Sequence, residues 1–124
     1  MGALMRLCLD TNILIDVLKG EPSALAWLEH QQRPAVSLIT WMEVLVGCQP
    51  DEAPVVQRWL EGFDRIAVDP CVAEMAVSLR REHALKLPDA IILATAQCSG
   101  LVLATRNTKD FPLRLGGVLH PYEL

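Results

Sequence analysis

The chain has 124 residues, of which 52% are hydrophobic and 21% charged; this supplies one continuous core and argues against a disordered chain. We therefore expect a single domain over residues 1–124. The formal net charge of −4 and an isoelectric point near 5.3 argue against a broad basic surface for nucleic acid. No apolar run approaches the length of a membrane span, because Asp10, Asn12 and Asp16 interrupt the apolar N-terminal stretch.

Short apolar runs alternate with longer helical patterns along the chain, which predicts a parallel sheet with helices on both faces. The predicted strands are 7–9, 35–38, 66–68, 101–104 and 118–120. The predicted helices are 12–19, 23–30, 40–46, 55–63, 70–85 and 88–99. The expected fold is therefore a three-layer α/β/α sandwich around a four- to five-stranded, mainly parallel sheet. Met5, before Arg6, is an alternative start to Met1.

The four cysteines are widely spaced, with no C-x-x-C pair and no histidine at the spacing of a zinc site. Their neighbours are largely apolar, as in the stretches LCLD and TAQCS. We therefore expect reduced, mostly buried thiols and a reducing compartment, the cytoplasm.

The acidic residues fall beside the predicted strand ends. Asp10 ends the first strand, and Glu43 is expected in the first turn of the helix after the second strand. Asp89 begins the helix before the fourth strand, which Asn107 and Asp110 follow. Because the carboxyl ends of parallel strands share one edge of a sheet, these side chains are expected to converge there. Carboxylate oxygens are the ligands that Mg²⁺ prefers.

Each of these residues also has a local explanation. Asp10 could belong to a helix-initiating turn, and Asp89 follows Pro88 at a helix start. Thr40 and Glu43 match the capping box S/T-x-x-E. Asn107 and Asp110 lie in a polar turn, where Asn and Asp commonly form local hydrogen bonds. The metal site is favoured by the convergence of all of them on one edge.

Four blocks of the sequence resemble PIN-domain nucleases, and among these the VapC-type toxins of bacterial toxin–antitoxin pairs. The blocks are LDTNILID at 9–16, TWMEV at 40–44, LPDAIILATA at 87–96 and LATRNTKDF at 103–111. They occur in the order of the family and together cover nearly the whole chain. The resemblance implies a metal-dependent ribonuclease that uses one or two Mg²⁺ or Mn²⁺ ions to hydrolyse RNA phosphodiesters.

Carried over residue by residue, the resemblance makes Asp10, Glu43 and Asp89 metal-binding catalytic acids. The fourth position departs from one form of the family pattern. Some members have an aspartate where this chain has Asn107, and others with asparagine there use the acid three positions later, here Asp110. Both residues therefore remain candidates for the fourth site residue.

Other residues of the same blocks are expected to support the site. Thr11, Asn12 and Thr105 would orient the carboxylates. Arg106 and Lys109 lie beside the predicted site and are the candidates for binding RNA phosphates, although a solvated turn explains them equally well.

The family resemblance also implies partners: an antitoxin lying along an apolar groove of the early helices, and a second copy in a homodimer. Trp27, Trp41 and Trp59 are expected mainly in the core, although exposure of Trp27, Trp41 or Leu45 would support the groove.

Two other functions are weighed. One is a non-catalytic PIN-like module that binds RNA or protein. The other is an aspartate-based phosphatase, against which the sequence argues, because Asn12 stands where a haloacid-dehalogenase-like enzyme would carry its second aspartate.

Overall fold

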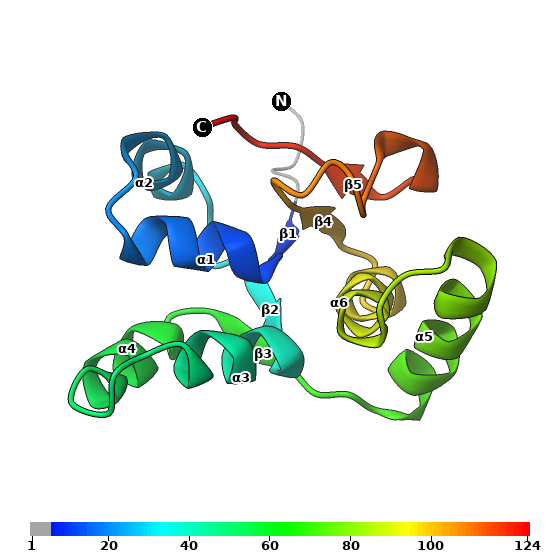
Figure 1. Cartoon of the computed structure of the whole chain (residues 1–124), viewed down its shortest axis with the longest axis horizontal. Coiled ribbons are helices and arrows are strands. Elements are labelled where there is room, and N and C mark those ends of the chain that lie inside the picture. The colour runs from blue at the N-terminus through cyan, green and yellow to red at the C-terminus, as the bar shows by residue number, and fades with distance from the viewer. Residues whose placement is uncertain (1–5) are drawn as a thin grey trace.

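The computed structural model describes residues 6–124, and a five-stranded sheet lies at its centre (Figure 1). The strands are β1 Leu7–Leu9, β2 Ala35–Ser37, β3 Asp64–Ile66, β4 Val102–Ala104 and β5 Val118–Leu119. They lie in the order β3-β2-β1-β4-β5, and every neighbouring pair is parallel. The predicted parallel sheet is therefore confirmed. The alternative starts Met1 and Met5 lie outside the described residues.

Helices cover both faces of the sheet (Figure 1). One layer contains α1 Thr11–Leu18, α2 Pro22–Glu29, α3 Leu38–Val46 and α4 Ala53–Leu60. The other contains α5 Pro70–His83 and α6 Leu87–Cys98. A short 3₁₀ helix, η1 Leu113–Leu115, precedes β5. The predicted three-layer α/β/α sandwich is confirmed.

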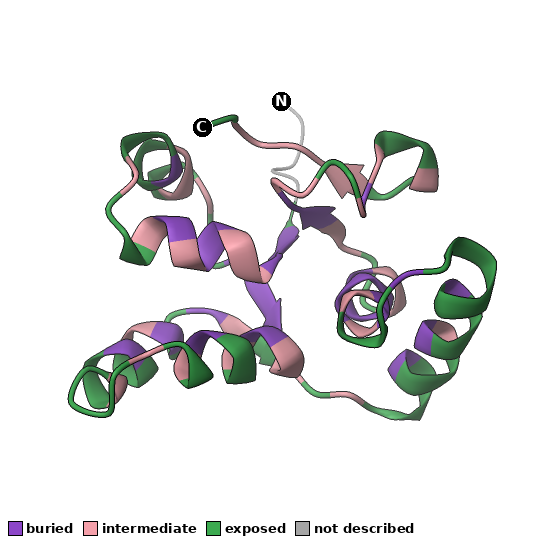
Figure 2. Cartoon of the chain, viewed as in Figure 1, coloured by how far each residue is buried: buried purple, intermediate pink, exposed green. Residues whose placement is uncertain are grey.

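The two faces of the sheet contribute to separate hydrophobic clusters because successive side chains of a strand point in opposite directions. Leu7 and Leu9 of β1 pack toward α1–α4, whereas Cys8 packs toward α5 and α6. The strands β1 and β2, most of β4 and the inward helix faces are buried, and the outer helix faces are exposed (Figure 2). The three tryptophans pack half-buried at the margin of the α1–α4 cluster.

The start of α3 differs from the prediction. The Ser37 hydroxyl accepts from the Ile39 N–H at 3.1 Å and caps the helix, so α3 begins at Leu38 and not at Thr40. Thr40 is thus buried inside the helix, and Glu43 lies in its second turn, not its first. The capping-box interpretation of these two residues is wrong, which leaves the Glu43 carboxylate available for another role.

The third strand lies two residues earlier than predicted, at Asp64–Ile66. It is an edge strand whose Asp64 and Arg65 are not buried, so its apolar pattern indicates the position of the strand only weakly.

The helix α5 stops at His83 because Ala84 takes a left-handed conformation, with φ of 55°. The other element boundaries match the predicted ones to within one to three residues.

The cysteines only partly follow the prediction. All four are free thiols, but only Cys8 is buried; Cys48 and Cys98 are half-buried, and Cys71 is exposed. Cys71 lies in the first turn of α5, and its Sγ is 3.0 Å from the Cys98 Sγ in α6. The expectation of mostly buried thiols is therefore wrong. Across residues 6–124, no helix combines the length and the apolar character needed to cross a membrane.

Candidate active site

Asp10 stands at the junction between β1 and α1. Its backbone N–H donates to the Ala104 carbonyl at 2.9 Å, which ties it to the neighbouring strand β4. Its carboxylate accepts from the Thr11 N–H at 2.8 Å and from the Thr105 hydroxyl at 2.6 Å. The residue is only 5% exposed. The two central strands therefore hold this carboxylate in one orientation.

Glu43 reaches the site from α3. Its carboxylate accepts from the Thr11 hydroxyl at 2.7 Å, and the same hydroxyl oxygen lies 3.0 Å from that of buried Thr40. Thr11 therefore contacts both acids, Asp10 through its backbone and Glu43 through its side chain. The N-terminus of α1 and the middle of α3 are held together at this point.

Asp89 lies in the first turn of α6, where Pro88 favours the helix start. It is half-buried and lines the same hollow as Asp10 and Glu43. This hollow, which we call the acidic hollow, has a volume of about 310 Å³. Its lining residues are Asp10, Thr11, Asn12, Ile15, Asp16, Lys19, Glu43, Asp89, Arg106 and Asn107.

The turn after β4 contains the two candidates for the fourth site residue. The Asn107 side-chain amide donates to the Asp110 carboxylate at 3.0 Å, and the Asp110 N–H donates to the Asn107 side-chain oxygen at 3.1 Å. The Asn107 N–H also donates to the Thr105 hydroxyl at 3.0 Å. Asn107 lines the acidic hollow, whereas Asp110 lines a neighbouring hollow and acts electrostatically on Asp89.

Arg106 is engaged inside the protein. Its Nε and Nη2 donate to the two carboxylate oxygens of Asp16 at 2.7 and 2.9 Å. The Tyr122 hydroxyl donates to the same carboxylate at 2.8 Å. The Asn12 side chain accepts from the Arg106 N–H at 3.3 Å and donates to Thr105 at 3.5 Å. Arg106 therefore fixes the turn that carries Asn107, and of the two predicted RNA-binding residues, Lys109 has the more exposed side chain.

The electrostatic environment raises the pKa of two of the acids. Burial raises the pKa of Asp10 to about 6; hydrogen bonds from Thr105 and Thr11 oppose this, and the Asp89 and Glu43 charges add to it. Burial also raises the pKa of Asp89, followed by the charges of Asp110 and Glu43, while Lys86 acts in the opposite direction. The acids therefore repel one another.

The carboxylates share one hollow but do not form a ready-made metal cage. Within residues 6–124, no three Asp, Glu, His or Cys side chains stand close enough to enclose a metal ion. Hydrogen bonds hold the carboxylates of Asp10 and Glu43, and the charges of these acids and of Asp89 act on one another. The donor set still suits a hard cation, because it consists of oxygen ligands whose repulsion a cation would relieve.

The sequence profile of the PIN domain family matches residues 7–113. The chain belongs to this family. Among curated proteins, this PIN domain is 28% identical to the tRNA(fMet)-specific endonuclease VapC of Shigella flexneri, over 93% of this chain and 96% of that one. It is 31% identical to Ribonuclease VapC10 of Mycobacterium tuberculosis, over 84% of each chain.

Among solved structures, the PIN domain superposes on a chain of a toxin-antitoxin complex from Klebsiella pneumoniae with a TM-score of 0.90 and 48% identity. The match covers 95% of this chain and 99% of that chain. Together with the curated relatives, it places this PIN domain in the VapC-type group.

Sequence reasoning missed the structural role of Asp16 and Tyr122 in this PIN domain. Asp16 is 2% exposed, although in the sequence it stands out only as a polar residue in an apolar stretch and as the last residue of a motif. A buried acid on an apolar helix face needs a cation, and this was a usable signal. Nothing in the sequence identified Arg106 and Tyr122 as its partners, because they lie about 90 and 106 positions away.

Proposed function

We propose that this VapC-type PIN domain is an endoribonuclease that hydrolyses RNA phosphodiesters with one or two Mg²⁺ or Mn²⁺ ions, and that it acts as the toxin of a toxin–antitoxin pair. The observation that carries the proposal is the environment of Asp10. This carboxylate is fixed at the ends of two central strands; its burial raises its pKa, and the charges of Asp89 and Glu43 add to that rise. The family relatives supply the reaction class.

Asp10, Glu43 and Asp89 would hold the cation, with Asn107 or Asp110 as the fourth residue. When bound, such a cation lowers the pKa of a coordinated water and offsets the charge that builds on the phosphate. The chain's own residues supply orientation. Thr105 and the Thr11 amide fix the Asp10 carboxylate, the Thr11 hydroxyl fixes Glu43, and the Asn107 side chain holds Asp110.

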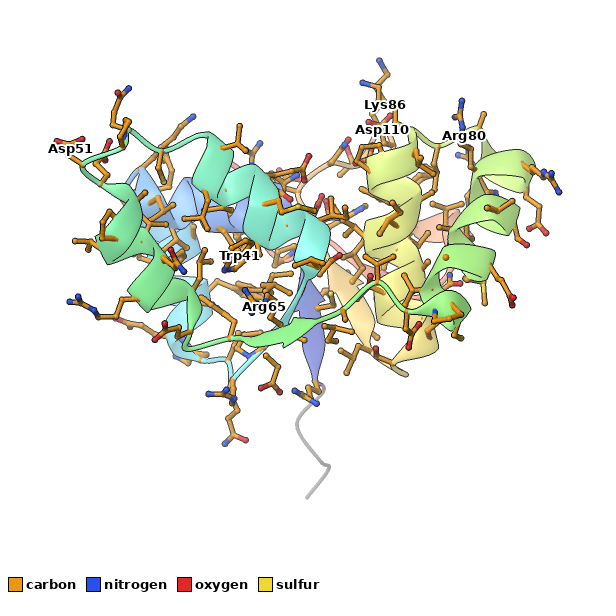
Figure 3. All side chains as sticks on the ribbon, turned by 90° about the horizontal axis from the view of Figure 1, so that it is seen from below. Trp41, Asp51, Arg65, Arg80, Lys86 and Asp110 are labelled. Carbon is orange, nitrogen blue, oxygen red and sulfur yellow. The ribbon has the colours of Figure 1, made fainter. Side chains whose placement is uncertain are left out.

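The test is cleavage of a labelled single-stranded RNA by the purified chain, in a chelator and after addition of Mg²⁺ or Mn²⁺. We expect cleavage only with the cation, and its loss in Asp89→Asn. Asp51→Asn is the matched control, since Asp51 is exposed in the loop between α3 and α4, far from Asp110 (Figure 3). Cleavage that survives both the chelator and Asp89→Asn would refute the proposal. Tight RNA binding without cleavage would instead favour a non-catalytic module.

An antitoxin is the proposed protein partner, since similar solved chains come from toxin-antitoxin complexes. A groove of about 210 Å³ between α1, α3 and α4, lined largely by apolar side chains, supports this proposal. Leu18, which lines the groove, is 43% exposed. Trp27 and Trp41 are half-buried and lie outside the lining of this groove. Co-purification with the product of an adjacent gene, lost in Leu18→Glu, tests the groove.

A cytoplasmic homodimer is proposed as the form in which the chain acts. Light scattering of the purified chain would test the dimer. A monomer at all concentrations used in the cleavage assay would contradict it.

A further inference from the structure

A second hollow opens beside the acidic one, with a volume of about 420 Å³. We call it the basic hollow. The charged and titratable side chains that line it are Glu82, His83, Lys86, Lys109, Asp110 and Arg114. They come from the end of α5, the start of α6, the turn after β4 and η1. Segments distant in sequence therefore place three permanent cations around one depression.

One wall of the basic hollow is fixed by the turn between α5 and α6. Ala84 is left-handed, and the Arg80 Nη1 donates to the Leu85 carbonyl at 2.6 Å. This places Lys86 directly before the first residue of α6. The free N–H groups at that helix terminus add positive potential to the side chain's own charge.

The three cations of the basic hollow differ from most of the other basic residues. Arg6 and Arg33 pair with Asp64, and Arg106 pairs with Asp16. Arg65 lies over the Trp41 ring at 4.7 Å, and Arg80 is held by a carbonyl. Within residues 6–124, by contrast, Lys86, Lys109 and Arg114 form no ion pair and are exposed. In a chain of net charge −4, this grouping of available cations points to an anionic ligand.

The basic and acidic hollows are adjacent. Asp110 lines the basic hollow and bonds to Asn107 of the acidic hollow at 3.0 Å. Asp110 and Lys86 both act electrostatically on Asp89, in opposite directions. Figure 3 shows Lys86 and Asp110 together at the N-terminal end of α6. A polyanion that reaches the acids from this side must therefore pass the lysines and Arg114.

We propose that the basic hollow binds backbone phosphates of the RNA strand on one side of the bond that is cut, through Lys86, Lys109 and Arg114. This inference rests on the proposed ribonuclease function and adds the path of the substrate to it. RNA is favoured over an acidic protein segment because the basic hollow adjoins the acids of the proposed cleavage site, which a strand held there by its phosphates would reach. Contacts of this kind position a strand without reading its bases.

The test measures binding of a fluorescein-labelled, 20-nucleotide single-stranded RNA of mixed sequence to the full chain carrying Asp89→Asn, across a series of NaCl concentrations. Lys86→Gln with Arg114→Gln should weaken binding about tenfold and reduce the slope of log K against log salt by about one unit. Lys109→Gln alone removes one charge and should cause roughly half of the change in log K and half of the change in slope. Arg58→Gln with Arg81→Gln is the control, because it removes the same charge from exposed positions of α4 and α5 outside the hollow.

In the active chain, Lys86→Gln with Arg114→Gln should raise KM more than it lowers kcat, because these contacts position phosphates that do not react. Circular dichroism melting would verify that both double variants fold. If the hollow variant and the control bind RNA equally while the active chain still cuts, the inference fails and the ribonuclease proposal stands.

Failure of the proposed function gives a different pattern. An unsubstituted chain that neither binds nor cuts RNA would remove both proposals. Binding of a polyglutamate peptide that is lost in Lys86→Gln with Arg114→Gln, with RNA binding unchanged, would overturn the RNA assignment and give the hollow to an acidic protein partner.

Discussion

Two buried aspartates lie at opposite ends of α1, and their surroundings differ in charge. Asp10, directly before the helix, is 5% exposed, and Asp16, in its last turn, is 2% exposed. Burial raises the pKa of Asp10 to about 6, and the charges that act on it are those of two further carboxylates, Asp89 and Glu43. Burial acts on Asp16 in the same direction, but the Arg106 and Tyr122 hydrogen bonds and the Arg106 charge outweigh it, so its pKa is lowered.

The difference separates an acid used for structure from an acid available for chemistry. Asp16 has its countercharge inside the protein, where a two-point contact with Arg106 satisfies both oxygens. Asp10 has hydroxyl and amide donors but, within residues 6–124, forms no salt bridge, so its charge is left to be balanced by something bound. Burial alone does not distinguish the two; the sign of the neighbouring charge does.

The largest expected effect is on catalysis. Asp10→Asn keeps the shape of the side chain but removes its charge and one of its two hydrogen-bond acceptors, and should lower RNA cleavage by on the order of 10³-fold. Asp16→Asn should keep cleavage within about tenfold, because Asp16 is charge-compensated by the protein. Initial rates at saturating Mg²⁺ would measure both. An equal loss of cleavage in Asp10→Asn and Asp16→Asn would contradict the assignment of catalysis to Asp10 and of structure to Asp16.

The next effect is on stability. Asp16→Asn should lower the free energy of unfolding by about 3–4 kcal/mol, because it leaves Arg106 without its countercharge. Urea unfolding monitored by tryptophan fluorescence would measure this. Asp10→Asn should be neutral or stabilising in a chelator, since it removes a repelled carboxylate. A loss of less than about 1 kcal/mol for Asp16→Asn would mean that the ion pair adds little.

The pH dependence of stability should have opposite signs for the two residues. Between pH 3.8 and about 6, Asp10 keeps its proton in the native state but has lost it in the unfolded state. The free energy of unfolding therefore falls as pH rises through this range, by at most about 3 kcal/mol. Above about pH 6 this contribution no longer changes with pH. For Asp16 the lowered native pKa makes stability fall as pH drops below the unfolded value. Unfolding in a chelator between pH 3 and 8, with each Asn variant as reference, would separate the two contributions. Slopes of the same sign would contradict the assignment.

The smallest effect concerns the phenol of Tyr122. Tyr122→Phe keeps the ring beside Trp27, where the centroids are 6.2 Å apart, and removes the hydrogen bond to Asp16. The loss should be about 1 kcal/mol in the free energy of unfolding, without an effect on cleavage. Thermal and urea unfolding would measure it. A large loss of cleavage would show that this end of the chain acts on the site.

The sequence predicted the parts of the site that depend on sheet topology. In a parallel sheet the strand ends share an edge, so placing Asp10 and Asn107 required only the positions of two strands. The turn of α3 that holds Glu43 was misplaced because Ser37, the last residue of β2, also caps the helix. The position of the edge strand β3 was predicted two residues too late, because two of its three residues are polar and the strand lacks a clear apolar pattern.

Contacts between distant segments could not be predicted from the sequence. The basic hollow joins Lys86 to Arg114, and neither residue lies in a pattern that indicates the other. The partners of Asp16 were hidden for the same reason. Periodicity and capping signals act over a few residues, whereas these contacts depend on how the loops pack after the fold has formed.

The central position of β1 has a consequence for how an activity at this site can be controlled. The strand has neighbours on both sides, and β3 and β5, the strands with one free edge, have only three and two residues. Local fluctuations begin at such margins, and the middle of a sheet opens only with the whole protein. Fraying of the edge strands therefore leaves Asp10 in place. An activity at Asp10 can then be blocked in the folded protein by a molecule that covers the site.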